Sequence, residues 1–279
     1  MRILCLHGSG MSPDIMKAQM STLRELCDPS WEFHFLAGRI TCPPAPGVQH
    51  LPGPYLCYSA DFDPVSVRAA QVLVQKEFET QGPFDGVLGF SAGAAILAGY
   101  LLNQRTRYPG KPLPVQFAVF CSAVPIVSTD PIYYQALYGS LSSEEEQMIR
   151  SGQLDQILKL REPIRTAAKT VATVTDTLKS ILDNPPTHFL DRQPLEIPCP
   201  VHPDLYKARL NIPTLHIRGK KEPRSLKECA LVLESFCSPS LRRTLEHRTP
   251  HSLPTSRAEV EDMLAAMEEV VGSDRRARL

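Results

Sequence analysis

The sequence predicts an α/β fold in which a mainly parallel, doubly wound sheet is covered by helices on both faces. The first reason is that short apolar runs of strand length alternate with longer segments of helical period along the chain. The second is that 43% of the 279 residues are apolar, which is enough for a large buried core. The third is that many of the 26 prolines fall in clusters between these segments, where they mark loops.

The first part of the chain supplies the opening elements of this fold. Short apolar runs bounded by turn residues predict strands over residues 2–7, 32–36, 86–89 and 115–121. Apolar residues that recur three or four positions apart predict helices over residues 15–27, 65–81 and 92–103. Each helix separates two strands, which is the order of a parallel βαβ unit.

The last part of the chain returns to the same alternation. Residues 214–218 and 241–246 are apolar runs that predict strands, and residues 226–236 and 257–271 have the helical period. These elements extend the same parallel sheet.

The interval from Ser122 to Ile212 breaks the alternation, because it is far longer than a βαβ crossover requires. Within it, Ser142 and Glu145 have the spacing of a helix capping box, and apolar residues then recur at helical spacing as far as Ile181. We expect residues 1–279 to form a single domain in which residues 122–212 are a helical, lid-type insertion. The alternative is a peripheral helical pair with no role at a site.

Charge and composition exclude several classes of function. The 30 Lys and Arg residues balance the 30 Asp and Glu residues, so the chain lacks the basic excess of a nucleic-acid binder. No run approaches the roughly 18 apolar residues of a membrane span. The eight cysteines lack metal-ligand spacing, and no cofactor or metal is implied. Without a signal peptide before the first strand, we expect a soluble, cytoplasmic protein with reduced thiols.

The segment Gly89-Phe90-Ser91-Ala92-Gly93 carries the strongest chemical signal in the sequence. It follows a predicted strand and opens a predicted helix, which is the setting of a nucleophile elbow. On so tight a turn the serine backbone is strained, and the two glycines leave space for the strand and the helix to approach each other. We predict that Ser91 is a nucleophile. An inert serine in a tight turn is the alternative.

A serine hydroxyl needs a base that accepts its proton and a carboxylate that orients the base. In folds with this elbow, the chain order is serine, then acid, then histidine. Glu222 follows the strand over residues 214–218, and His251 lies in the loop between the last strand and the last helix. We predict Glu222 as the acid and His251 as the general base. The competitors are His247 for the base and Asp191 or Asp204 for the acid.

Backbone N–H groups are expected to stabilise the oxyanion of a tetrahedral intermediate. Ala92, directly after the nucleophile, supplies one. The loop after the first strand should supply the other, because its small residues let the backbone approach the substrate; Ser9 is the first choice and Gly10 the second. We expect His7, in the same loop, to pack beneath the site.

These residues resemble the fungal-type serine hydrolases related to the human ovarian-cancer-associated hydrolase, within the α/β-hydrolase superfamily. The resemblance rests on segments 3–8, 82–93, 212–219 and 247–254. It implies an α/β-hydrolase fold. It also implies a stand-alone thioesterase or esterase that releases a polyketide acyl chain from an acyl-carrier domain in secondary metabolism.

Two positions depart from that family's pattern, which usually has Asp where Glu222 stands and Gly where Pro250 stands. Glutamate is one methylene longer than aspartate, and proline fixes its own φ. Both changes therefore affect the distance and orientation between the carboxylate of Glu222 and the imidazole of His251. The long interval before Ile212 suggests a wall or lid for a large, apolar acyl chain.

The same acyl-Ser91 intermediate allows more than one outcome. Water would release an acid, whereas an alcohol would give a lactone or a transferred acyl group. A non-catalytic binding protein on a hydrolase fold is a further alternative, motivated by Glu222 and Pro250. The acyl chain and the oligomeric state stay open.

The last three residues, Ala277-Arg278-Leu279, resemble the small-basic-leucine signal read by the peroxisomal import receptor. A peroxisomal location is therefore the alternative to a cytoplasmic one. The alternative is that these three residues belong to a frayed, solvated tail and have no targeting role.

Overall fold

The computed structural model describes residues 1–181 and 197–277. Within these ranges, six strands form one sheet in the order β2-β1-β5-β6-β7-β8, and every neighbouring pair is parallel. The strands are β1 (Arg2–Leu6), β2 (Glu32–Leu36), β5 (Gly86–Phe90), β6 (Phe117–Cys121), β7 (Thr214–Gly219) and β8 (Arg242–His247). The predicted strands are all present: β2 has the predicted bounds, and each of the others differs from them by one or two residues at one or both ends.

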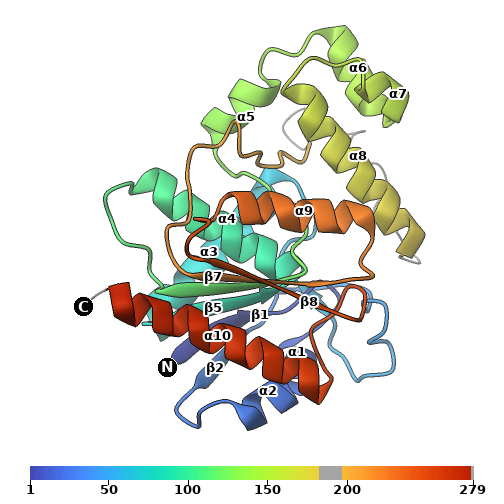
Figure 1. The fold of residues 1–279 in the computed structure, drawn as a ribbon. Coiled ribbons are helices and arrows are strands. Elements are labelled where there is room, and N and C mark those ends of the chain that lie inside the picture. Colours follow the sequence, from blue (N-terminus) through green and yellow to red (C-terminus); the bar gives the residue numbers. More distant parts are fainter. Residues whose placement is uncertain (182–196, 278–279) are drawn as a thin grey trace.

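Helices cover both faces of this sheet, as the alternation predicts (Figure 1). One face carries α1 (Pro13–Gln19), α2 (Ser21–Leu26) and α10 (Arg257–Ala277), and the other carries α3 (Pro64–Gln81), α4 (Ala92–Arg107) and α9 (Arg224–Ser235). Side chains of β1 show the division. Leu4 and Leu6 belong to one buried cluster and Ile3 and Cys5 to the other, because successive side chains of a strand point to opposite faces.

The predicted helix over residues 15–27 is wrong in one respect, since the structure has two helices that meet at Met20. Ser12 caps the first helix by accepting a hydrogen bond from the Ile15 N–H. Met16 and Leu23, on either side of the break, are buried in the same apolar cluster. The apolar period therefore continues through the break and gives no sign of it.

A two-stranded antiparallel ladder lies in the region that the sequence assigns to a proline-rich loop. It pairs β3 (Ile40–Thr41) with β4 (Leu56–Cys57). Strands of two residues have no detectable period, so the sequence could not predict them. The ladder matters for the site, because Leu56 also pairs with the chain just after β1.

Helices α5 (Pro131–Tyr138), α6 (Ser143–Ser151), α7 (Leu154–Ile157) and α8 (Ile164–Ile181) lie between β6 and β7 in the chain. The capping box is confirmed: Ser142 accepts from the Glu145 N–H at 3.1 Å, and Glu145 accepts from the Ser142 N–H at 2.9 Å. Buried residues Ile149, Ile157 and Ile164 belong to the same apolar cluster as Leu4 and Leu6. These helices therefore share the main core, and α8 packs on α9.

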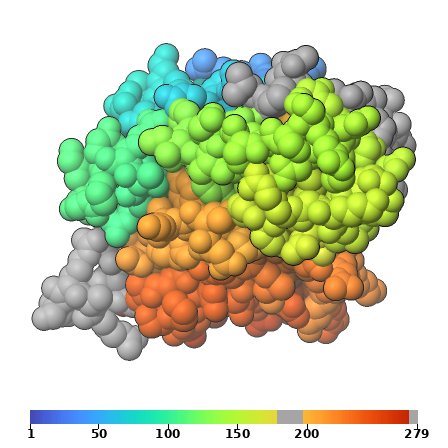
Figure 2. All heavy atoms as spheres, turned by 90° about the horizontal axis from the view of Figure 1, so that it is seen from above, coloured from blue at the N-terminus to red at the C-terminus, as the bar shows by residue number. Residues whose placement is uncertain are grey.

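Figure 2 shows the residues of α5–α8, green to yellow-green, gathered on one face beside the light-orange segment that begins near residue 200. Hydrogen bonds join the two: the Tyr133 hydroxyl donates to the Pro200 carbonyl at 3.1 Å, and the Val201 N–H donates to the Ile126 carbonyl at 2.9 Å. Among the helices of the described ranges, none combines the length and the apolar character needed to cross a membrane. Arg278 and Leu279, of the predicted import signal, lie outside the described residues.

Two buried histidines make the stability of the fold depend on pH. Burial lowers the pKa of His7 to about 4, and burial together with Arg242 and Arg218 lowers that of His216 to about 3. An unfolded chain binds these protons near pH 6.5. Between about pH 6.5 and 4 the unfolded state thus holds more protons, so we expect the free energy of unfolding to fall as the pH falls, by up to about 1.4 kcal/mol per pH unit for each histidine.

Urea denaturation at about pH 7.5, 6 and 5 measures this slope. We expect His216→Gln to flatten it, whereas His50→Gln, at an exposed histidine, should leave it unchanged. A stability that stays constant over this range would contradict the assignment.

Candidate active site

Ser91 occupies the tight turn between β5 and α4, with φ 54° and ψ −120°. This positive φ is costly for a residue with a side chain. A Cβ on Gly89 would lie 2.5 Å from the Ala94 Cα, and one on Gly93 would lie 2.4 Å from the Leu6 carbonyl oxygen. Both flanking positions therefore require glycine, which is the physical reason for the spacing of the motif.

Hydrogen bonds from both sides hold this turn in place. The Ser91 N–H donates to the carbonyl of Cys121, at the end of β6, at 2.9 Å. The Ser91 carbonyl accepts from the Ala95 N–H at 3.2 Å, which starts α4. The strained backbone is thus fixed by a neighbouring strand and by the helix that follows.

The structure brings the side chains of Ser91, His251 and Glu222 into one chain of hydrogen bonds. The Ser91 hydroxyl and the His251 Nε2 are 2.8 Å apart, and the His251 Nδ1 bonds to the Glu222 Oε1. For both bonds to form, His251 must carry its proton on Nδ1 and accept the hydroxyl proton at Nε2. The imidazole is about one-quarter exposed, whereas the Glu222 side chain is fully buried.

Glu222 reaches His251 from the turn that follows β7. Its N–H donates to the Gly219 carbonyl at 3.2 Å, and the turn leads directly into α9. The N-terminus of a helix carries a partial positive charge, which favours a carboxylate at this position. The longer side chain of glutamate thus spans the distance to the imidazole, and the departure from the family's aspartate does not break the contact.

Gly219 lets the loop of His251 lie directly on the end of β7. A Cβ there would approach the Thr249 carbonyl oxygen to 2.2 Å and the Pro250 carbonyl oxygen to 2.3 Å. On the other side of His251, the ring of Phe90 lies 5.3 Å away between ring centroids. Pro250 is exposed, and His251 after it still contacts both Glu222 and Ser91. The base is therefore held between β7 and the residue that precedes the nucleophile.

The competing residues do not join this group. His247 is buried at the end of β8, where its Nδ1 bonds to the Thr249 hydroxyl at 2.7 Å, and burial lowers its pKa. The Asp204 side chain is 85% exposed and lies 3.5 Å from the His202 Nδ1. Asp191 lies outside the described residues. Within the described chain, Glu222 is the carboxylate in contact with His251.

The loop after β1 passes directly beside the nucleophile. A Cβ on Gly8 would lie 3.2 Å from the Ser91 Cβ, and Ser9 follows as an exposed residue. The N–H of Ala92, in the first turn of α4, belongs to the backbone donors that a helix does not use internally. The N–H of Gly10 donates to the Leu56 carbonyl at 3.0 Å, so Gly10 is already engaged elsewhere. Ser9 and Ala92 thus remain the candidates for the oxyanion site.

His7 and Tyr58 hold this loop in place. His7 is buried, as expected: its Nδ1 donates to the Gly8 carbonyl at 2.7 Å, and its Nε2 accepts from the Gly38 N–H at 3.1 Å. The Tyr58 hydroxyl accepts from the His7 N–H at 3.0 Å and donates to the Leu36 carbonyl at 2.8 Å. Tyr58 follows a two-residue strand and carries no sequence signal for this role.

Apolar side chains border the nucleophile on the α9 side. Ala95, Val124 and Leu226 form a small buried cluster, and Phe62 and Ala92 pack against it. Ala92 adjoins Ser91, and Leu226 lies in the first turn of α9, just after Glu222. The nucleophile is therefore bordered by buried apolar side chains on this side.

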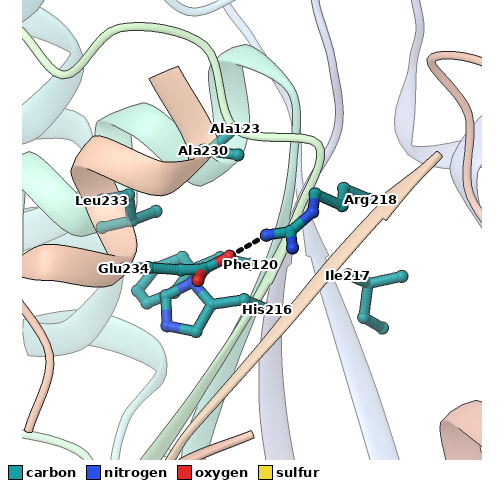
Figure 3. Close-up of a pocket in the computed structure, with 8 residues that line it drawn as sticks. All are labelled: Phe120, Ala123, His216, Ile217, Arg218, Ala230, Leu233 and Glu234. Atoms are coloured by element: carbon teal, nitrogen blue, oxygen red, sulfur yellow. Dashed lines mark hydrogen bonds and ion pairs between the residues drawn. The ribbon is translucent and has the colours of Figure 1, made fainter. Parts of the chain in front are cut away.

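A separate small pocket, partly open to solvent, lies between β7 and α9 (Figure 3). Its wall contains the buried His216 beside an ion pair between Arg218 and Glu234, and Arg218 also bonds to Glu246 at 3.1 Å. The low pKa of His216 keeps its ring neutral at physiological pH. The side chains bonded to Ser91 lie outside this pocket, so we assign it to packing between helix and sheet.

No group of three or more His, Cys, Asp or Glu side chains in residues 1–181 and 197–277 is arranged to hold a metal ion. The site in the described chain consists of a nucleophilic hydroxyl, an imidazole base and a buried carboxylate. That combination performs acyl transfer through a covalent serine intermediate.

Comparison with known proteins agrees with this geometry. The family model described as Serine hydrolase (FSH1) matches residues 1–263. The serine hydrolase cnsH of Penicillium expansum is 39% identical over 220 residues, covering 79% of this chain and 91% of that protein. The esterase alnB of Emericella nidulans is 31% identical over 272 residues, covering 96% of this chain and 95% of that protein.

Among solved structures, the mouse α/β hydrolase domain-containing protein 10 superimposes with a TM-score of 0.53 at 13% identity, covering 98% of this chain and 90% of that one. This likeness shows the α/β-hydrolase fold, which confirms the predicted fold class.

The hydrogen-bonded chain predicts how substitutions change the reactivity of Ser91. Glu222→Gln should slow labelling of Ser91 by a fluorophosphonate about 100-fold or more, because the amide no longer stabilises the imidazolium that forms as the hydroxyl reacts. His247→Gln, the matched change at the competing histidine, should keep the labelling rate within about threefold. Peptide mapping by mass spectrometry measures both. If the two variants lose labelling rate equally, the assignment of His251 as the base is wrong.

Proposed function

The chain belongs to the serine hydrolase (FSH1) family, and from this membership we propose that it cleaves an acyl thioester, or an ester of the same acid, through an acyl-Ser91 intermediate. The observation that carries the proposal is the continuous contact from Glu222 through His251 to Ser91. Two similar proteins bear the names serine hydrolase and esterase, and an acyl-serine intermediate serves both kinds of substrate.

In the first half of the reaction, the Ser91 Oγ attacks the acyl carbonyl carbon while His251 Nε2 takes the hydroxyl proton. Glu222 stabilises the imidazolium that results. The carbonyl oxygen becomes an oxyanion, for which the N–H groups of Ala92 and Ser9 are the proposed donors. Collapse of the tetrahedral intermediate breaks the carbon–sulfur bond, and His251 returns its proton to the departing thiolate. Water then repeats these steps on the acyl-enzyme and releases the acid.

The acyl donor that we propose is a polyketide chain on the pantetheine arm of a carrier domain. A cluster of basic residues around the site supports an acidic, phosphate-bearing partner. It consists of Lys220, Lys221, Arg224, Lys227 and Arg248, which flank Glu222 and His251. In the described chain neither Lys220 nor Lys221 forms an ion pair, whereas Arg224 pairs with Glu228 at 2.9 Å.

This basic cluster is compact. The Lys220 N–H donates to the His247 carbonyl at 2.8 Å, which brings Arg248 beside the turn of Glu222, and the Lys227 ammonium donates to the Lys220 carbonyl. The chain as a whole has a net charge of zero, so the positive charge here is local. Exposed lysines can attract an acidic surface and speed its docking, an effect that salt screens.

The proposal predicts thioesterase activity that depends on Ser91. The wild-type protein should hydrolyse acyl N-acetylcysteamine thioesters, and Ser91→Ala should remove that activity, because no other hydroxyl bonds to His251 in the described chain. Release of free thiol, followed with a thiol reagent, measures the rate. A folded wild-type protein that cleaves neither thioesters nor the matching esters would overturn the proposed function.

The carrier is tested with the same acyl group on a phosphopantetheinylated carrier domain. Lys220→Glu with Lys221→Glu should lower kcat/KM for the carrier-borne substrate by about tenfold at low salt and leave the small thioester unaffected. Lys17→Glu with Arg24→Glu, an equal charge change at exposed positions of α1 and α2, is the control. Equal effects of both pairs would count against a carrier docking beside Glu222.

A further inference from the structure

Two cysteines lie at the two ends of the proline-rich loop that joins β3 to β4. Cys42 directly follows β3, and Cys57 is the last residue of β4. All eight cysteines fall in the described ranges and are free thiols; seven are buried, and Cys42 is the one that is partly exposed. A dissolved oxidant can therefore reach the Cys42 sulfur more readily than any of the others.

The register of the β3–β4 ladder puts these two side chains on the same face. Ile40 pairs with Cys57. One residue beyond the end of β3, the Cys42 N–H donates to the Tyr55 carbonyl at 3.0 Å, which continues the ladder. Residues directly opposite each other share a face, and so do residues two apart in one strand. Cys42 and Cys57 are therefore diagonal neighbours on one face of the ladder.

The two thiols are close enough to interact. Burial raises the pKa of the Cys57 thiol to about 12, and the charge of the neighbouring Cys42 thiolate and a hydrogen bond between the two side chains contribute to this rise. Diagonal positions in an antiparallel pair lie roughly 7–8 Å apart between Cα atoms, and a disulfide joins Cα atoms up to about 7 Å apart. A bond between these sulfurs thus needs only a small shift of two very short strands.

The loop between the two cysteines holds the chain next to the nucleophile. The Gly10 N–H donates to the Leu56 carbonyl at 3.0 Å, and the Ala45 N–H donates to the Gly10 carbonyl at 3.0 Å. The contact is tight, since a Cβ on Gly10 would lie 2.3 Å from the Ala45 nitrogen. Both partners of Gly10 belong to residues 42–57. A bond at the ends of this loop would therefore restrain the residue that follows Ser9.

We propose that Cys42 and Cys57 form a reversible disulfide that closes the loop of residues 42–57 and restrains the chain after β1. The oxidant is a low-molecular-weight disulfide such as glutathione disulfide. The Cys42 thiolate attacks one of its sulfurs, forms a mixed disulfide and releases one glutathione. The Cys57 thiolate then attacks the Cys42 sulfur and releases the second glutathione. The two electrons and the two thiol protons of the protein end on the two glutathione molecules.

The test incubates the folded protein with glutathione disulfide and identifies the products by intact mass and by peptide mapping without reduction. We expect the loss of two hydrogen atoms and a pair of peptides joined through Cys42 and Cys57, which dithiothreitol separates again. The closed loop has fewer open conformations, so chymotrypsin should cleave within residues 43–56 about fivefold more slowly or less in the oxidised protein.

Three variants serve as controls. Cys42→Ser changes a partly exposed side chain, so it should fold but give neither the bond nor the protection. Cys57→Ser should stop the exchange at the mixed disulfide and leave one glutathione on Cys42. Cys27→Ser, at the most exposed of the seven buried cysteines, should keep both the bond and the protection.

Three results would overturn the proposed bond. They are an unchanged mass, a wild-type glutathione adduct on Cys42 that never converts to the bond, and a bond between another pair of cysteines. A bond that forms without slowing cleavage within residues 43–56 would overturn the proposed restraint of the loop. None of these readouts requires turnover, so the outcome does not depend on the proposed acyl transfer.

Discussion

The positive φ of Ser91 is the constraint on which the arrangement of the site depends. A residue with a side chain holds that backbone conformation only when its surroundings fix it, and here β6 and the first turn of α4 do so through hydrogen bonds. The strain aims the Oγ out of the turn toward His251. It also forces glycine at positions 89 and 93, because any Cβ there would collide with backbone atoms. The spacing of Gly89, Ser91 and Gly93 in the sequence thus follows from the backbone conformation of this one turn.

The buried carboxylate of Glu222 is the second requirement, and its environment explains how the fold tolerates it. A carboxylate removed from water needs a charged or hydrogen-bonding partner. His251 and the N-terminus of α9 supply that environment for one oxygen, whereas within the described residues the Oε2 has no hydrogen-bond partner. Because Gly219 has no Cβ, the loop that carries His251 can lie against the end of β7, next to the turn that carries Glu222.

Much of the fold and the candidate site was predictable because each rests on a local rule. The alternation of short and long apolar periods predicts the parallel sheet, and chain order together with position after a strand selects Ser91, Glu222 and His251. Long-range contacts were not predictable. Segments that meet only in the folded chain form the β3–β4 ladder and the hydrogen bond from the Gly10 N–H to the Leu56 carbonyl. The same holds for the hydrogen bond between the His7 N–H and the Tyr58 hydroxyl. His247 and His251 differ in burial and partners, which spacing does not reveal.

The central claim is that Ser91 carries the acyl group during turnover. The most direct measurement mixes the protein rapidly with an acyl thioester, quenches it in acid and determines the intact mass and the modified peptide. We predict an added mass equal to the acyl group minus one hydrogen, located on the peptide that contains Ser91, which disappears as hydrolysis proceeds. Turnover by the wild type with no acyl adduct on that peptide at any quench time, or an adduct on another residue, would contradict it.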